Sequence, residues 1–106
     1  GVRKFQALEC EISALRKSQE ESMKRLVAME EMAQRRERNK LRDLLLQNYR
    51  YYTNSETNPS HSWTRMESEA FWELFKDYEE AGGNGYVHTV VQPAMLGLTI
   101  TDVKVH

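Results

Sequence analysis

Apolar residues recur at alternating spacings of three and four through the first third of the chain. With Phe5 placed at position a of a heptad, seven of the nine a and d positions up to residue 33 are apolar, and Gln19 with Ser22 forms one polar layer. This period of 3.5 is typical of a coiled coil. Residues 2–52 also contain no Gly or Pro and are rich in strong helix formers. We therefore expect one helix about 75 Å long, from a rise of 1.5 Å per residue.

A single helix in water cannot bury such a stripe, so the pattern predicts a partner helix. We expect a parallel homodimer; packing of the helix inside a larger globular protein is the alternative. The register fails near 34–40 and resumes after an insertion of four residues, which is a stutter. The predicted dimer interface comprises Phe5, Leu8, Ile12, Leu15, Leu26, Met29, Ala33, Leu41, Leu44 and Leu45.

The polar pattern changes at residue 53. Residues 53–62 are rich in turn formers, with Pro59 among them, which predicts a loop over 53–63. Thr64 and Glu67 then have the spacing of a capping box, so a second helix is expected over about 65–81, with Gly82 as its C-terminal stop.

The end of the chain is rich in β-branched residues. Runs at about 86–92 and 95–105, joined across Pro93 and Ala94, predict a β-hairpin, with a bulge or third strand where the apolar phase shifts to Val103 and Val105. The predicted fold class is therefore mostly α: a coiled-coil helix over 1–52 and a small α+β unit over 64–106. A terminal apolar strand without a partner indicates an excised fragment.

Aromatic residues gather around the loop. They predict either the core of the small unit or an interface for a partner protein, and both interpretations stay open. The set, called here the aromatic set although it includes the leucine Leu74 on the same helical face, is Tyr49, Tyr52, Trp63, Phe71, Leu74, Phe75 and Tyr78. Aromatic residues stand on both sides of the loop, and residues 1–52 carry a net charge of +4 against −5 for residues 53–106. We therefore expect Tyr49 and Tyr52 to pack around Trp63 and Phe71, mainly through hydrophobic burial, with the charges orienting the contact.

A basic run crosses the stutter: Arg35, Arg36, Arg38, Lys40 and Arg42. A basic leucine zipper carries its basic region before its heptads, whereas here the better heptads come first. The net charge of −1 also argues against a duplex-binding protein. We interpret the run as a solvated helical surface, with nucleic-acid binding as the least favoured function.

The sequence contains no motif that is typical of catalysis or of metal binding. His61, His88 and His106 lie in different segments, far from Cys10, and no spacing fits a metal site, a nucleophile motif or a phosphate loop. We expect no enzyme activity, no cofactor, no metal and no membrane insertion. The single cysteine favours an intracellular protein, cytoplasmic or nuclear.

These patterns predict a homodimerisation and scaffold segment of a larger protein, for example a cytoskeletal or chromosome-associated one. The alternative is a protein-binding module that captures a partner strand on the hairpin edge or a partner helix on the aromatic helix.

Overall fold

The first element is a single long helix. The computed structural model describes residues 1–102, and α1 spans Val2–Thr53, which confirms the predicted helix to within one residue. The chain divides into two compact units, Gly1–Gln34 and Arg35–His106, called here the N-terminal unit and the C-terminal unit. The division falls inside α1, so the last turns of the helix fold with the residues that come after them.

The second long helix, α2, spans Arg65–Glu80 and begins at the predicted capping box. The Glu67 amide donates to Thr64 Oγ1 at 3.1 Å, and the Thr64 amide donates to Glu67 Oε1 at 2.8 Å. The Arg65 amide donates to a carboxylate oxygen of Asp102 at 2.6 Å. Two carboxylates therefore satisfy amides at the positive end of the helix dipole. Gly82, at φ 82°, ends the helix as expected.

The predicted β-hairpin is wrong. Residues Val87–Val91 form η1, one turn of π-helix, and Gln92–Leu96 form the short helix α3. The buried residues of this segment are Val87, Val91, Met95 and Leu98, at intervals of four, four and three. That is the period of a helix, and it outweighs the strand preference of the β-branched residues. Pro93 lies in the first turn of α3, where proline is tolerated.

One short pair of strands remains. β1 (Ser62–Trp63) and β2 (Thr99–Ile100) pair in parallel, Ser62 opposite Thr99 and Trp63 opposite Ile100. The Thr99 amide donates to the His61 carbonyl at 3.2 Å, and the Thr101 amide donates to the Trp63 carbonyl at 3.0 Å. Of the strand expected over 95–105, the residues described up to position 102 contain only the two of β2. The predicted phase shift at Val103 and Val105 lies outside the described residues.

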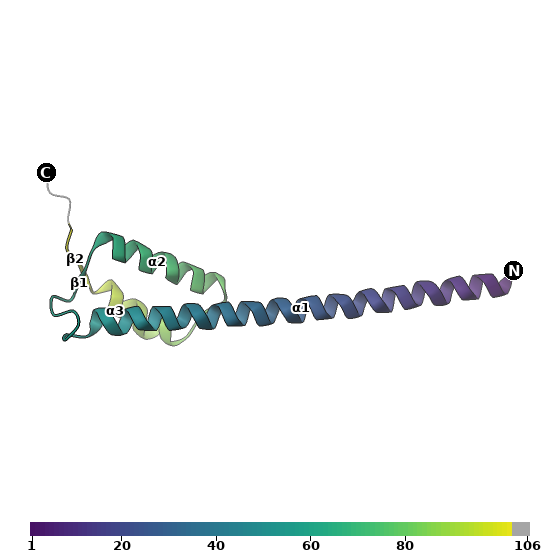
Figure 1. The fold of residues 1–106 in the computed structure, drawn as a ribbon, viewed down its shortest axis with the longest axis horizontal. Helices are drawn as coiled ribbons and strands as arrows, with labels where there is room; N and C mark the ends of the chain where they lie inside the picture. Colours follow the sequence, from purple (N-terminus) through teal and green to yellow (C-terminus); the bar gives the residue numbers. More distant parts are fainter. Residues whose placement is uncertain (103–106) are drawn as a thin grey trace. The chain divides into compact units, whose positions relative to one another are not determined.

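The C-terminal unit has one hydrophobic core. In Figure 1, α2 and α3 lie beside the C-terminal part of α1. Side chains from all three helices belong to one buried cluster. The core consists of Leu41, Leu45, Trp63, Phe71, Phe75, Tyr78, Ala81, Val87, Val91, Met95 and Leu98. Three helical segments and a strand pair thus form a small, mostly helical unit. This confirms the mostly α fold class and replaces the hairpin with helices.

Candidate functional site

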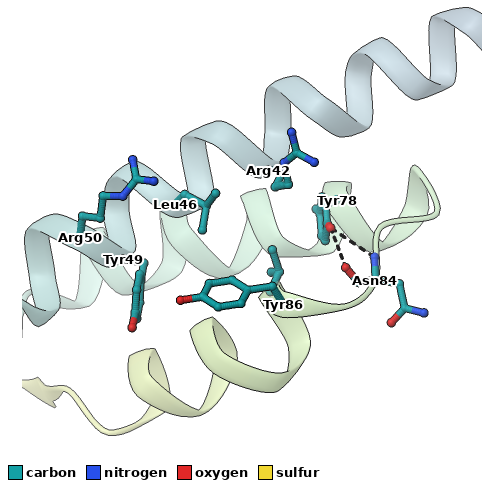
Figure 2. A pocket seen from close by; sticks show the side chains of 8 residues that line it. Arg42, Leu46, Tyr49, Arg50, Tyr78, Asn84 and Tyr86 are labelled. Atoms are coloured by element: carbon teal, nitrogen blue, oxygen red, sulfur yellow. Dashed lines mark hydrogen bonds between the residues drawn. The ribbon is translucent and has the colours of Figure 1, made fainter.

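A pocket of about 280 Å³ opens within the C-terminal unit (Figure 2). Helix α1 supplies four of its lining residues, at spacings that place them on one helical face. The other lining residues come from α2, the loop after it and the start of η1. The lining is Arg42, Leu46, Tyr49 and Arg50 of α1, with Tyr78, Asn84, Tyr86 and Val87. The pocket therefore combines an apolar interior with two guanidinium groups.

Tyr78 forms a fixed wall of this pocket. Its hydroxyl donates to the Asn84 carbonyl at 2.9 Å and accepts from the Asn84 amide at 3.2 Å. The loop passes so close to the ring that a Cβ on Gly83 would lie 2.3 Å from it. Glycine is thus required at position 83, and the two hydrogen bonds hold the loop against α2.

Tyr49 and Tyr86 form the other aromatic part of the pocket. Their rings are nearly perpendicular, with centroids 6.5 Å apart, and Figure 2 shows the Tyr86 ring directed toward Tyr49. Burial, together with hydrogen bonding and charge repulsion with Tyr86, raises the pKa of the Tyr49 hydroxyl above its ordinary value of 10.0. A tyrosine hydroxyl is already protonated at pH 7, and this shift extends the protonated range of Tyr49 to higher pH.

Tyr52 packs against Trp63 as predicted, whereas the aromatic partner of Tyr49 is Tyr86. The rings of Tyr52 and Trp63 lie 5.5 Å apart, and Trp63 lies 5.5 Å from Phe71. The Tyr52 hydroxyl donates to Glu67 Oε2 at 2.6 Å. Burial and this bond raise the pKa of Tyr52 to about 12, while the bond from Tyr52 lowers the pKa of Glu67. The end of α1 is thus fixed to the start of α2.

The remaining residues of the predicted aromatic set differ in their burial. Phe71, Phe75 and Tyr78 are buried in the core, and Leu74 packs against it with partial exposure. These residues form the interior of a single chain. The central members of the set are therefore buried in the core of a single chain.

The predicted dimer interface falls into two parts. Leu41 and Leu45 are 6% and 0% exposed because they pack into the core of their own chain, so they are not available to a second copy. Leu44, between them, is 38% exposed. The remaining predicted interface residues, all before position 34, are exposed. The continuation of the seam past the stutter is thus corrected: Leu41 and Leu45 are core residues of the C-terminal unit.

The basic run does not form one patch. Arg35, Arg36 and Lys40 are exposed. Arg38 is half-buried, and its Nη1 donates to the Ala81 carbonyl at 3.1 Å, while Arg42 lines the pocket. The description of this run as solvent-facing therefore needs correction at Arg38, which contacts the end of α2.

Other candidate chemistry is sparse in residues 1–102. Within that range no three His, Cys, Asp or Glu side chains converge as a metal site, and Cys10 is exposed. His88 Nε2 lies 3.1 Å from a carboxylate oxygen of Glu79. No helix in the same range has both the length and the apolar character that crossing a membrane requires.

Sequence reasoning missed the pocket. Its residues on α1 have the spacing i, i+4, i+7 and i+8, which marks one helical face, but Tyr86 and Val87 come from the segment assigned to the hairpin. No protein-family model, curated protein or solved structure matches this chain. Inference about its function therefore rests on its own residues.

Proposed function

We propose that the N-terminal unit joins two copies of the chain in a parallel coiled coil, and that the protein acts as a dimerisation and scaffold segment. The observation that carries this proposal is the exposure of the predicted seam. Its six large apolar residues are 49–71% exposed in a single chain: Phe5, Leu8, Ile12, Leu15, Leu26 and Met29. A stripe of this kind on a regular 3.5 period is matched by a second helix with the same period.

The charges beside the seam favour a second copy as the occupant. In a parallel, in-register pair, each g residue faces the e residue of the next heptad on the partner. The three charged combinations are Lys4 with Glu9, Glu11 with Arg16, and Arg25 with Glu30. All three join opposite charges, and the fourth combination, Ser18 with Met23, is uncharged. A chain with this pattern complements itself.

The apolar stripe and the flanking charges contribute different amounts of free energy to dimerisation. Burying a large apolar side chain stabilises by roughly 1.5–3 kcal/mol, whereas an exposed ion pair contributes about 0–1 kcal/mol. The apolar stripe therefore supplies the driving force, and the flanking charges select the parallel orientation. Both copies of the C-terminal unit would then lie at the same end of the coiled coil. The proposal involves no catalysis and sets the protein in an intracellular compartment, where a single unpaired cysteine stays reduced.

Light scattering over a range of protein concentrations tests this proposal. The unmodified chain should give the mass of a dimer, and replacing Ile12 and Leu15 together by Asp should give monomers, because unpaired charge is costly to bury. Placing Asp at Ser13 and Ala14 adds the same charge on the outer face and should preserve the dimer. A monomeric unmodified chain, or equal behaviour of the two variants, would contradict the proposal.

A further inference from the structure

We propose that the pocket of the C-terminal unit binds a small aromatic anion, meaning a carboxylate or a phosphate ester carried on a flat apolar ring system. This inference is independent of dimerisation, because every lining residue lies between positions 42 and 87. Figure 2 shows both guanidinium groups beside α1, together with the Tyr49 and Tyr86 rings. The guanidinium groups suit the anionic part of such a ligand, and the tyrosine rings suit its flat aromatic part.

The interior of the pocket suits an aromatic body. Leu46, Val87 and three tyrosine rings form most of its lining. Aromatic rings prefer edge-to-face or offset contacts, and the Tyr49 and Tyr86 rings stand nearly perpendicular to each other in the lining. The volume of about 280 Å³ lies near the lower end of the ~300–1,000 Å³ common for small-molecule sites. A ligand of two fused rings is therefore the appropriate size.

The charge of the lining selects an anion. Arg42 and Arg50 contribute two positive charges, and the lining contains no acidic residue among the described positions. Arg42 Nε lies 3.8 Å from Asp43 Oδ1, and both side chains are about half or more exposed, so this contact competes only weakly. Guanidinium groups bind carboxylate and phosphate oxygens through paired hydrogen bonds.

The tyrosine hydroxyls reinforce this selection. A tyrosine hydroxyl is neutral at pH 7, and the raised pKa of Tyr49 keeps it neutral at higher pH as well, so Tyr49 does not repel an anion. Tyr78 is already engaged with Asn84 in both directions, which leaves its ring as a rigid wall. A neutral aromatic compound would leave both arginines unused, and an inorganic anion would leave the rings unused. The site fits a ligand that combines both features.

The first experiment compares four probes on the unmodified chain by amide NMR. 2-Naphthoate and 2-naphthyl phosphate should cause saturable shifts at Tyr49, Asn84, Tyr86 and Val87. Whichever of the two binds more tightly identifies the head group. Neutral 2-naphthamide and inorganic phosphate should each bind at least about tenfold more weakly, since one charge-assisted interaction accounts for that factor. Equal binding of naphthamide, or no saturable shift with either anion up to about 10 mM, would overturn the proposal.

The second experiment uses matched variants. Replacing Arg42 and Arg50 together by Gln should weaken binding of the tighter naphthyl anion by about tenfold or more. Replacing the exposed Arg35 and Arg36 by Gln removes the same charge outside the pocket and should leave the affinity within about twofold. Equal weakening by the two pairs would show a general charge effect and refute the site. If replacing Arg42 and Arg50 impairs folding, the comparison of the four probes on the unmodified chain still tests the proposal.

Discussion

The two units of this chain place similar residues in opposite environments. In the N-terminal unit, leucines, isoleucine and methionines at heptad positions stay exposed on a helix of one chain. In the C-terminal unit, Leu41 and Leu45 of the same helix are almost fully buried, because α2, η1 and α3 pack against them. Segments that follow α1 in the chain return to cover its C-terminal part, which accounts for this burial. A helix pattern alone thus does not distinguish a core from an interface.

The largest effect expected from this comparison concerns two neighbouring leucines. Leu45→Ala should lower the free energy of unfolding of the C-terminal unit by about 2–5 kcal/mol, because it leaves a cavity in a closed core. Leu44→Ala should cost less than about 1 kcal/mol, because its side chain already meets solvent. Urea denaturation monitored by tryptophan fluorescence measures this, since Trp63 and Trp72 both lie in this unit.

Dimerisation provides the complementary readout for the same two variants. Neither should change the dimer mass, if the seam ends before the stutter. If Leu44→Ala weakens the dimer and leaves the free energy of unfolding of the C-terminal unit unchanged, the seam continues along the exposed side of α1. That outcome would restore the predicted extension of the interface at Leu44 alone.

The comparison also explains which parts of the fold could be predicted. The capping box at Thr64 and Glu67 is a local signal, and the aromatic content around the loop implied a core, so α2 and its packing against Tyr52 were predictable. The predicted hairpin is wrong because the helical spacing of Val87, Val91 and Met95 outweighs the strand preference of their β-branched neighbours. The pocket could not be predicted, because Arg50 and Tyr86 are 36 positions apart and meet only once η1 and α1 share a core.

The next largest effect tests how α1 is fixed to α2. Tyr52→Phe removes the bond to Glu67 and should lower the free energy of unfolding by roughly 0.5–1.5 kcal/mol at pH 7. Tyr51→Phe is the control, because the Tyr51 side chain is 54% exposed. Urea denaturation at several pH values measures both variants.

The pH dependence is set by the direction of the two pKa shifts. Folding lowers the pKa of Glu67, so its contribution is present above its ordinary value of 4.5 and is lost as the pH falls through the lower folded value. Folding raises the pKa of Tyr52, so its contribution is present below pH 10 and is lost as the pH rises through about 12. The difference between wild type and Tyr52→Phe should shrink at both ends. A difference that is constant from pH 3 to pH 7 would rule out the carboxylate as the acceptor.

The smallest effect concerns the basic run, where one arginine differs from its neighbours. The last turn of α2 carries no basic residue, although a positive charge there would complement the helix dipole. Arg38 supplies that charge from α1 through its bond to the Ala81 carbonyl. Arg38→Gln should therefore cost roughly 0.3–1 kcal/mol, and Arg36→Gln, with the same change in charge on an exposed side chain, close to nothing.

Urea denaturation at low and high salt decides between a contact and a general charge effect. Salt screens exposed charges over about 10 Å at 0.1 M, so a cost that arises from overall charge would be shared by both arginine variants and would vanish with added salt. A cost confined to Arg38→Gln that persists in part at high salt identifies the half-buried bond as its source. If both variants lower the free energy of unfolding equally, Arg38 behaves as a solvent-exposed residue, as the sequence predicted. The stabilising contacts of the C-terminal unit would then start after Arg38.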